Sequence, residues 1–348
     1  AVLDAIRSVT DKPIHTVIYS HGHVDHAYGT WAIIEAGETP QIIAHDLLKP
    51  RFNRYIRLRG SLAKYMSQPE DQLPASTSDL VWPTRYFTDR LEIEVGDETF
   101  ILQHHKGETD DQLYVWVPGR KALASADYYQ GFLPNAGNGK RSQRHVEEWS
   151  VAMKEMAALN PQILLPAHGK EITEPAVIQE NFLALAEAFD YIVDHTIDGL
   201  NAGKRKEQIF GSVQLPEHLA NHPSLNVQYV TPNDISKMVI KKYTGWWDDI
   251  PSNWTPASME QQGNMIIELA GGNIPAITSY ARKLINQDIR LASHLTDWLF
   301  YARPDNAEVQ QLVFDVYKSR ILDPDTNTME MLTYLDQMTA AKERARRR

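Results

Sequence analysis

The sequence predicts a chain in two parts, an α/β part followed by an all-α part built of helical hairpins. Up to about residue 170, short apolar and β-branched runs of strand length alternate with turns and helical stretches. From Glu171 onward, strand signals largely cease and apolar residues recur at three- and four-residue spacing. A length of 348 residues exceeds one ordinary domain and allows two, each with its own core. We therefore expect domains at residues 1–172 and 173–348.

The composition is that of a globular protein, with 43% apolar and 23% charged residues. The net charge of −10 argues against a nucleic-acid partner, whose binding relies on Lys and Arg. The absence of cysteine excludes disulfides and thiolate ligands, and it is compatible with the cytoplasm and the periplasm alike. No apolar run reaches the ~18 residues of a membrane span, and the first residues lack a signal-peptide pattern. We expect a soluble protein that is cytoplasmic, periplasmic or secreted.

A cluster of histidines and an acid follows the first predicted strand, His15–Tyr19. The cluster lies in the run SHGHVDH, on the turn between this strand and the helical stretch Thr30–Glu35. Imidazole nitrogens and carboxylate oxygens are the ligands that suit zinc and its first-row neighbours. A tight turn can aim all of them at one point. The sequence therefore predicts a metal site with the ligands His21, His23, Asp25 and His26.

Later runs of strand length extend the α/β part. Leu91–Val95 alternates strictly between apolar and polar residues, and a glycine turn leads into Thr99–Leu102, which predicts a hairpin. The other predicted strands are Gln41–His45, Leu113–Val117, Lys121–Ala126 and Ile163–Pro166. Before the last of them, apolar residues at helical spacing predict a helix that packs on the core. These residues are Val146, Trp149, Met153 and Met156.

The segment Arg51–Gly60 is rich in both aromatic and cationic residues. One interpretation is an amphipathic helix with a solvated basic face. The other is an insertion that walls the mouth of the active site and offers cations to an anionic substrate. The sequence leaves both open.

The run HGHVDH resembles the HxHxDH signature of the metallo-β-lactamase-fold hydrolases. This resemblance implies an αββα sandwich that holds two metals between two sheets. It implies three further ligands: one in the turn Gly107–Asp110, normally a histidine, an acid after the strand that ends at Ala126, and a histidine after Ile163–Pro166. These positions are occupied by Glu108, Asp127 and His168. Because this fold places several strands before the signature, and only twenty residues precede it here, we expect the N-terminal part of the sandwich to be missing.

Glu108 stands where the family usually has a histidine, and this resembles the alkylsulfatase branch. His104 and His105 are alternative ligands in place of Glu108. Two segments of the helical part, Pro216–Pro223 and Tyr243–Trp254, resemble the alkylsulfatase dimerisation domain. The resemblance therefore implies a homodimer.

The implied site holds two divalent metals, zinc before others, with a water between them whose pKa is lowered toward neutrality. One metal would be held by His21, His23 and Glu108, the other by Asp25, His26 and His168, with Asp127 bridging. Asp25 and Asp127 are the expected catalytic carboxylates. The expected reaction is hydrolysis of a small-molecule ester, with alkyl sulfate esters as leading substrates. Lactones, phosphodiesters and β-lactams are alternatives, as is a metal-binding scaffold without turnover.

An alkyl sulfate needs cations for its head and an apolar wall for its chain. The candidates for the anionic head are Arg57, Lys140 and Arg141, with Asn135 and Asn138 as neutral donors. The candidates for the wall are Phe52, Tyr55, Phe132 and Leu133. The loop from Tyr128 to Arg141 departs from the segment that alkylsulfatases carry at this place.

Overall fold

The computed structural model describes residues 2–66 and 68–346. Contacts between residues divide the chain into two compact units. The first unit consists of the residues up to Lys204 together with Gln208–Val227 and Thr231–Thr244. The second consists of Arg205–Glu207, Gln228–Val230 and the residues from Gly245 onward. The sequence-based domain boundary between residues 172 and 173 stays a prediction.

The first unit contains two β-sheets. The smaller is parallel, in the order β1 (Thr16–Ile18), β2 (Gln41–His45) and β3 (Arg85–Phe87). The larger follows sequence order and consists of β4 (Arg90–Val95), β5 (Glu98–His104), β6 (Leu113–Val117), β7 (Ala122–Ala126) and β8 (Ile163–Pro166). Its strands are antiparallel except for the parallel pair β7 and β8. Strands β5, β7 and β8 therefore end at the same edge of the sheet.

Successive residues of β2 face opposite sides of their sheet, as the two-residue period of a strand requires. Ile43 packs with Leu102 and Leu113 of the larger sheet, which makes the core between the sheets. Ile42 and Ala44 instead belong to a cluster with helix residues, in which Phe52 is 1% exposed. An apolar run buried on both faces is typical of a central parallel strand.

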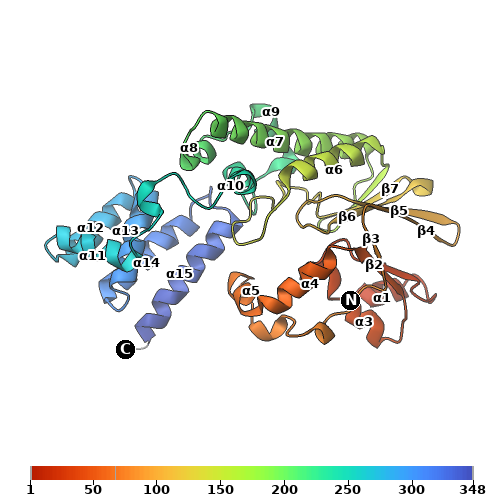
Figure 1. The fold of residues 1–348 in the computed structure, drawn as a ribbon, viewed down its shortest axis with the longest axis horizontal. Coiled ribbons are helices and arrows are strands. Elements are labelled where there is room, and N and C mark those ends of the chain that lie inside the picture. The colour runs from red at the N-terminus through yellow and green to blue at the C-terminus, as the bar shows by residue number, and fades with distance from the viewer. Residues whose placement is uncertain (1, 67, 347–348) are drawn as a thin grey trace. The chain divides into compact units, whose positions relative to one another are not determined.

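The helices up to residue 243 are α1 (Val2–Arg7), α2 (Val24–Ala27), α3 (Thr30–Glu35), α4 (Leu48–Arg57), α5 (Arg59–Met66), α6 (Val146–Ala158), α7 (Pro175–Asn201), α8 (Lys206–Gly211), α9 (Glu217–Ala220) and α10 (Pro232–Tyr243). In Figure 1, α6 and α7 lie on one side of the two sheets, and α1, α3 and α4 lie on the other. The order of layers is helix, sheet, sheet, helix. The predicted αββα fold class is confirmed.

The second unit is helical. Its helices are α11 (Met259–Leu269), α12 (Ile274–Ile285), α13 (Ile289–Ala302), α14 (Ala307–Ile321) and α15 (Thr328–Arg346). Helix α11 packs on α13, and helices α12 to α15 each pack on their neighbour in sequence. The core between them includes Leu299, Leu312 and Val313. The all-α second part is therefore confirmed. In the described part of the chain, none of the helices has both the length and the apolar run needed to cross a membrane.

Candidate metal centre

The turn after β1 is fixed by contacts with the larger sheet and with α4. Leu113 N donates a hydrogen bond to Ser20 O (2.9 Å), which brings the end of β1 to the edge where β5 ends. Gly22 N donates to Asp111 Oδ2 (2.8 Å). A Cβ atom at Gly22 would lie 2.8 Å from Leu48 Cδ1, so a larger residue would push the turn away from α4. The turn therefore reaches the sheet edge because glycine is at position 22.

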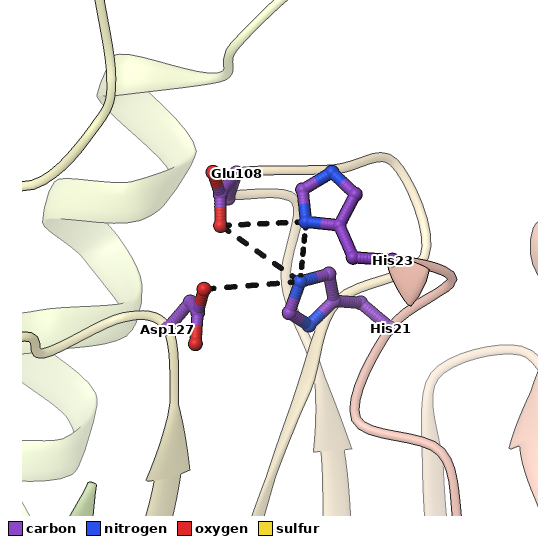
Figure 2. Close-up of side chains that lie close together, drawn as sticks. All are labelled: His21, His23, Glu108 and Asp127. Atoms are coloured by element: carbon purple, nitrogen blue, oxygen red, sulfur yellow. Dashed lines mark hydrogen bonds and ion pairs between the residues drawn. The ribbon is translucent and has the colours of Figure 1, made fainter. Parts of the chain in front are cut away.

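Four side chains meet at this edge in a buried group (Figure 2). The closest contact joins His21 Nε2 and His23 Nδ1 at 2.9 Å. Glu108 Oε2 lies 3.8 Å from His21 Nε2 and 3.7 Å from His23 Nδ1. Asp127 Oδ2 completes the group at 4.0 Å from His21 Nε2. One possible ligand atom from each residue lies within 4.8 Å of all the others.

Asp25, His26 and His168 form a second group. Asp25 Oδ2 lies 3.3 Å from His26 Nε2 and 3.5 Å from His168 Nε2. This group is more open than the first, because the side chains of Asp25 and His168 are 60% and 48% exposed. A substrate from solvent can reach it.

Asp127 lies between the two groups. Its Oδ2 faces His21, while its Oδ1 is 3.4 Å from His26 Nε2 and 3.5 Å from His168 Nε2. Ala126, the last residue of β7, adopts a left-handed φ of 49° where the pairing with β8 shifts register. Such strained backbone and β-bulges are frequent next to functional sites, where they re-aim a side chain.

Three buried atoms at the meeting point lack a hydrogen-bond partner among the described residues: His26 Nε2, Glu108 Oε2 and Asp127 Oδ1. Buried polar atoms without partners are costly unless something else satisfies them. Lone pairs of imidazole and carboxylate that converge in this way fit a divalent cation. The chemistry of both groups is thus that of metal ligands.

Charge is unevenly distributed over the buried histidines. Burial lowers the pKa values of His21 and His23 well below the ordinary value, with further lowering by His26 on His21 and by His21 on His23. These two imidazoles are therefore neutral. His23 Nε2 also lies 2.7 Å from Arg51 Nη2. Since a neutral imidazole has one lone pair, binding a cation through Nδ1 requires this contact with Arg51 to open.

The pKa values of Glu108 and His26 are raised, whereas that of Asp127 is lowered. Burial raises the pKa of Glu108 to about 8, although the Arg144 guanidinium opposes this. Burial also disfavours charge on Asp127, but the nearby side chains of His168 and His26 outweigh it and hold the pKa of Asp127 below its usual range. Burial lowers the pKa of His26, yet Asp127 and Asp25 outweigh it and raise the pKa to about 10. The two carboxylates thus favour positive charge at this place.

Sequence reasoning missed three charged residues around the first group. Arg144 is 1% exposed, and its Nη2 lies 3.0 Å from Glu108 Oε1. Arg51 is 7% exposed and lies 3.9 Å from Asp111 Oδ1, while Asp111 holds the histidine turn. Arg51 belongs to the cationic segment Arg51–Gly60. The sequence therefore indicated its charge, but it did not indicate that the side chain is buried next to the site. Arg144 and Asp111 gave no signal, because neither belongs to a motif.

The candidate substrate residues differ in their surroundings. Arg141 is mostly buried, and its Nη1 has no hydrogen-bond partner among the described residues. Burial lowers the pKa of Arg141; nearby Tyr55 and Glu108 oppose this, and Arg51 and Arg54 add to it. Arg141 therefore stands beside the first group, among other guanidinium groups.

The remaining candidates are less clearly directed at the site. Asn135 is half-buried with an unpartnered Oδ1, whereas Asn138 is buried and its Oδ1 accepts from Lys140 N (3.0 Å). Arg57 is exposed at the end of α4. Lys140 and Phe132 are half-buried. Three candidates for the apolar wall lie in the core: Phe52, Tyr55 and Leu133.

Comparison with known proteins gives two family matches. Residues 3–168 match the metallo-beta-lactamase superfamily, and residues 205–343 match the family described as alkyl sulfatase dimerisation. Members of the first superfamily bind divalent metals, in agreement with the ligand groups above.

Relatives match along most of the chain. It is 24% identical over 323 residues to a linear primary-alkylsulfatase of Pseudomonas sp., covering 85% of this chain and 61% of that protein. It is 21% identical over 336 residues to an alkyl/aryl-sulfatase of Saccharomyces cerevisiae, covering 87% and 51%. The chain thus spans 61% and 51% of the length of these two relatives.

The fold is shared with a solved structure. A stereoselective inverting sec-alkylsulfatase from Pseudomonas sp. superposes with a TM-score of 0.85 at 19% identity, covering 97% of this chain and 58% of that one. The solved structure shows the common fold, and the two family matches identify a metallo-beta-lactamase domain followed by an alkyl sulfatase dimerisation domain.

Proposed function

We propose that the chain is the core of a metal-dependent hydrolase of sulfate esters, with alkyl sulfates as leading substrates. The observation that carries the proposal is the position of Asp127, whose two oxygens face two separate groups of ligand side chains. The two relatives described above, which match most of the chain, are an alkylsulfatase and an alkyl/aryl-sulfatase, and this supports the choice of ester. Zinc is the first choice of metal because the ligands are imidazoles and carboxylates.

Each residue has a proposed role. His21, His23 and Glu108 would hold one ion, Asp25, His26 and His168 the other, and Asp127 would bridge both. Two bound ions would lower the pKa of a water between them and stabilise negative charge on the ester. Asp25 and Asp127 would orient this water as the catalytic carboxylates. The exposed second group supports entry of the ester from that side.

Recognition of the sulfate is assigned first to Arg141. A sulfate ester is an anion, and a guanidinium donor that is buried without a partner is suited to it. The charges of Arg51 and Arg54 nearby make the same region cationic. Lys140, Asn135, Asn138, Tyr55 and Arg57 stay candidates for further contacts.

The substrate proposal predicts the behaviour of Arg141→Ala. Its KM for a series of alkyl sulfates should rise at least about tenfold more than its KM for a neutral ester, because only the anion loses a charge-assisted hydrogen bond. The matched control is Arg120→Ala. Arg120 is an exposed arginine in the turn before β7, at the opposite edge of the larger sheet from Asp127.

Steady-state kinetics on alkyl sulfates, a lactone, a phosphodiester and a β-lactam decide between the alternatives. The lactone, the phosphodiester or the β-lactam becomes the proposed substrate if it is turned over faster than the alkyl sulfates and if Arg141→Ala leaves the KM for alkyl sulfates unchanged. Metal binding without turnover of any ester would favour the scaffold.

A further inference from the structure

The two carboxylate oxygens of Glu108 have different surroundings. Oε1 lies 3.0 Å from Arg144 Nη2, and Arg144 Nη1 donates a hydrogen bond to the main-chain carbonyl of Glu108. Oε2 has no hydrogen-bond partner among the described residues and faces the ring nitrogens of His21 and His23. The guanidinium therefore occupies one side of the carboxylate and leaves the other side turned toward the site.

Both members of this pair are buried. Arg144 is 1% exposed and Glu108 is 4% exposed. The ion pair recorded for Arg144 within the described residues is with Glu108. A buried charge that loses its partner is strongly destabilising, so each of the two depends on the other.

The segments that carry the pair are also joined by their backbones. His145 N donates to Gly107 O (3.0 Å), and His145 Nε2 lies 2.7 Å from Asp110 Oδ1. His145 is the residue from which α6 begins, and the buried face of α6 packs in the core. Arg144 thus lies just before α6, in a segment that is tied to the turn of Glu108 by a main-chain and a side-chain contact of His145.

We infer that Arg144 is a positioning residue, whose cation stabilises the ionised form of Glu108 that a metal needs and whose two guanidinium contacts turn Oε2 toward His21 and His23. The inference rests on the metal site proposed above and adds a residue to it. An imidazole at position 108 would be neutral and would leave the Arg144 cation buried without a partner. Arg144 therefore makes the site specific for a carboxylate at position 108.

The test is a double-mutant cycle on Glu108→His and Arg144→Met. Zinc stoichiometry and affinity are measured by competition with a chromophoric chelator, and the cobalt-loaded proteins are compared by their visible absorption, which reports the ligand set. Each single variant should bind the ion of the first group at least about tenfold more weakly, while the ion of the second group is retained. The double variant should regain most of the affinity, because a neutral ligand then faces a neutral neighbour.

A purely structural role for Arg144 predicts another pattern. Arg144→Met would then weaken metal binding equally with Glu or His at position 108, and the effects of the two substitutions on the free energy of metal binding would add. That result overturns the inference. Arg144→Met with two ions of unchanged affinity overturns it as well and leaves the metal site standing. A wild-type chain that binds no ion overturns both.

Two further variants separate an effect on the metal site from a general loss of folding. Arg144→Lys keeps the positive charge but not the two guanidinium nitrogens that contact Glu108, so this variant should fold. Its affinity for the first ion should lie between those of the wild type and Arg144→Met. An affinity no better than that of a folded Arg144→Met contradicts the role as counter-charge. Arg120→Met removes a different Arg–Glu pair, with Glu98, at the other edge of the sheet, and should leave both ions unchanged.

Discussion

At the scale of single residues, the neighbours of Glu108 are held away from the site. His104 Nδ1 lies 2.8 Å from Gln112 O, and His105 Nε2 lies 2.6 Å from Glu155 Oε2. Glu108 Oε2 instead faces His21 and His23. The geometry thus favours Glu108 over both histidines as the ligand at this place.

This geometry predicts a ranking of three alanine variants. Glu108→Ala should weaken binding of one zinc ion by about tenfold or more, because it removes a ligand, whereas His104→Ala and His105→Ala should change it far less. Titration of the metal-free proteins against a chromophoric chelator measures the affinities. The reverse ranking would transfer the ligand role to one of the histidines.

The seven ligand candidates could be found from the sequence because each stands in a short run with a recognisable pattern. Arg144 could not, since its role depends on the contact between the start of α6 and the loop after β5. The role of Gly22 also depends on contacts with residues that are distant in sequence. The glycine gives room to Leu48 and Arg51, 26 and 29 positions later in the sequence.

At the scale of elements, a pair of histidines joins the two sheets. His45 at the end of β2 stacks on His104 at the end of β5, with ring centroids 3.6 Å apart. Burial, together with the proximity of His45, lowers the pKa of His104 to about 4. The folded protein therefore holds a neutral ring where the unfolded chain has a histidine of pKa ~6.5.

This shift predicts a loss of stability in acid. The folded pKa is depressed, so the contribution of His104 is complete above pH ~6.5 and declines as the pH falls toward 4. After allowance for partial exposure, the loss at pH 5.5 is about 1 kcal/mol. His104→Gln should remove this part of the pH dependence.

Urea unfolding of the metal-free proteins at pH 7.5 and 5.5 measures the effect. His15→Gln is the control, since His15 is an exposed histidine before β1. If His104→Gln loses as much stability on acidification as the wild type, the stacked pair does not link pH to the packing of the sheets.

The strands of the larger sheet agree with those predicted from alternation and strand length, because these patterns are local. Helices α2 and α5 were not predicted, because α2 has only four residues and most of α5 lies beyond the segment Arg51–Gly60, for which a helix was one of two interpretations. The path of the loop after Asp127 could not be predicted either. It is fixed by distant contacts, such as Leu133 N with Asn226 O (3.1 Å).

At the scale of the whole molecule, the second unit carries an exposed cluster of tryptophans. Trp246 and Trp254 are 76% and 60% exposed, with ring centroids 5.3 Å apart, and Trp247 packs edge-on against Trp254. Exposed aromatic clusters are typical of protein interfaces. Residues 205–343 match a dimerisation family, so we propose that this cluster contributes to a homodimer.

Light scattering should give twice the chain mass of 39.6 kDa at micromolar concentration. Trp246→Ala with Trp254→Ala should shift the mass toward the monomer, since the double change removes the two exposed rings of this cluster. Tyr280→Ala, which removes a 55% exposed aromatic residue of α12, is the control. A wild-type mass of 39.6 kDa would refute the homodimer.

The central claim is that the two ligand groups that meet at Asp127 hold two metal ions in each chain. The measurement that tests it most directly is elemental analysis of the protein after loading with excess zinc and removal of unbound ions. We predict two zinc ions per chain, because seven ligand side chains exceed what one tetrahedral ion can use. No more than one tightly bound ion per chain would contradict the two-metal site and the mechanism built on it.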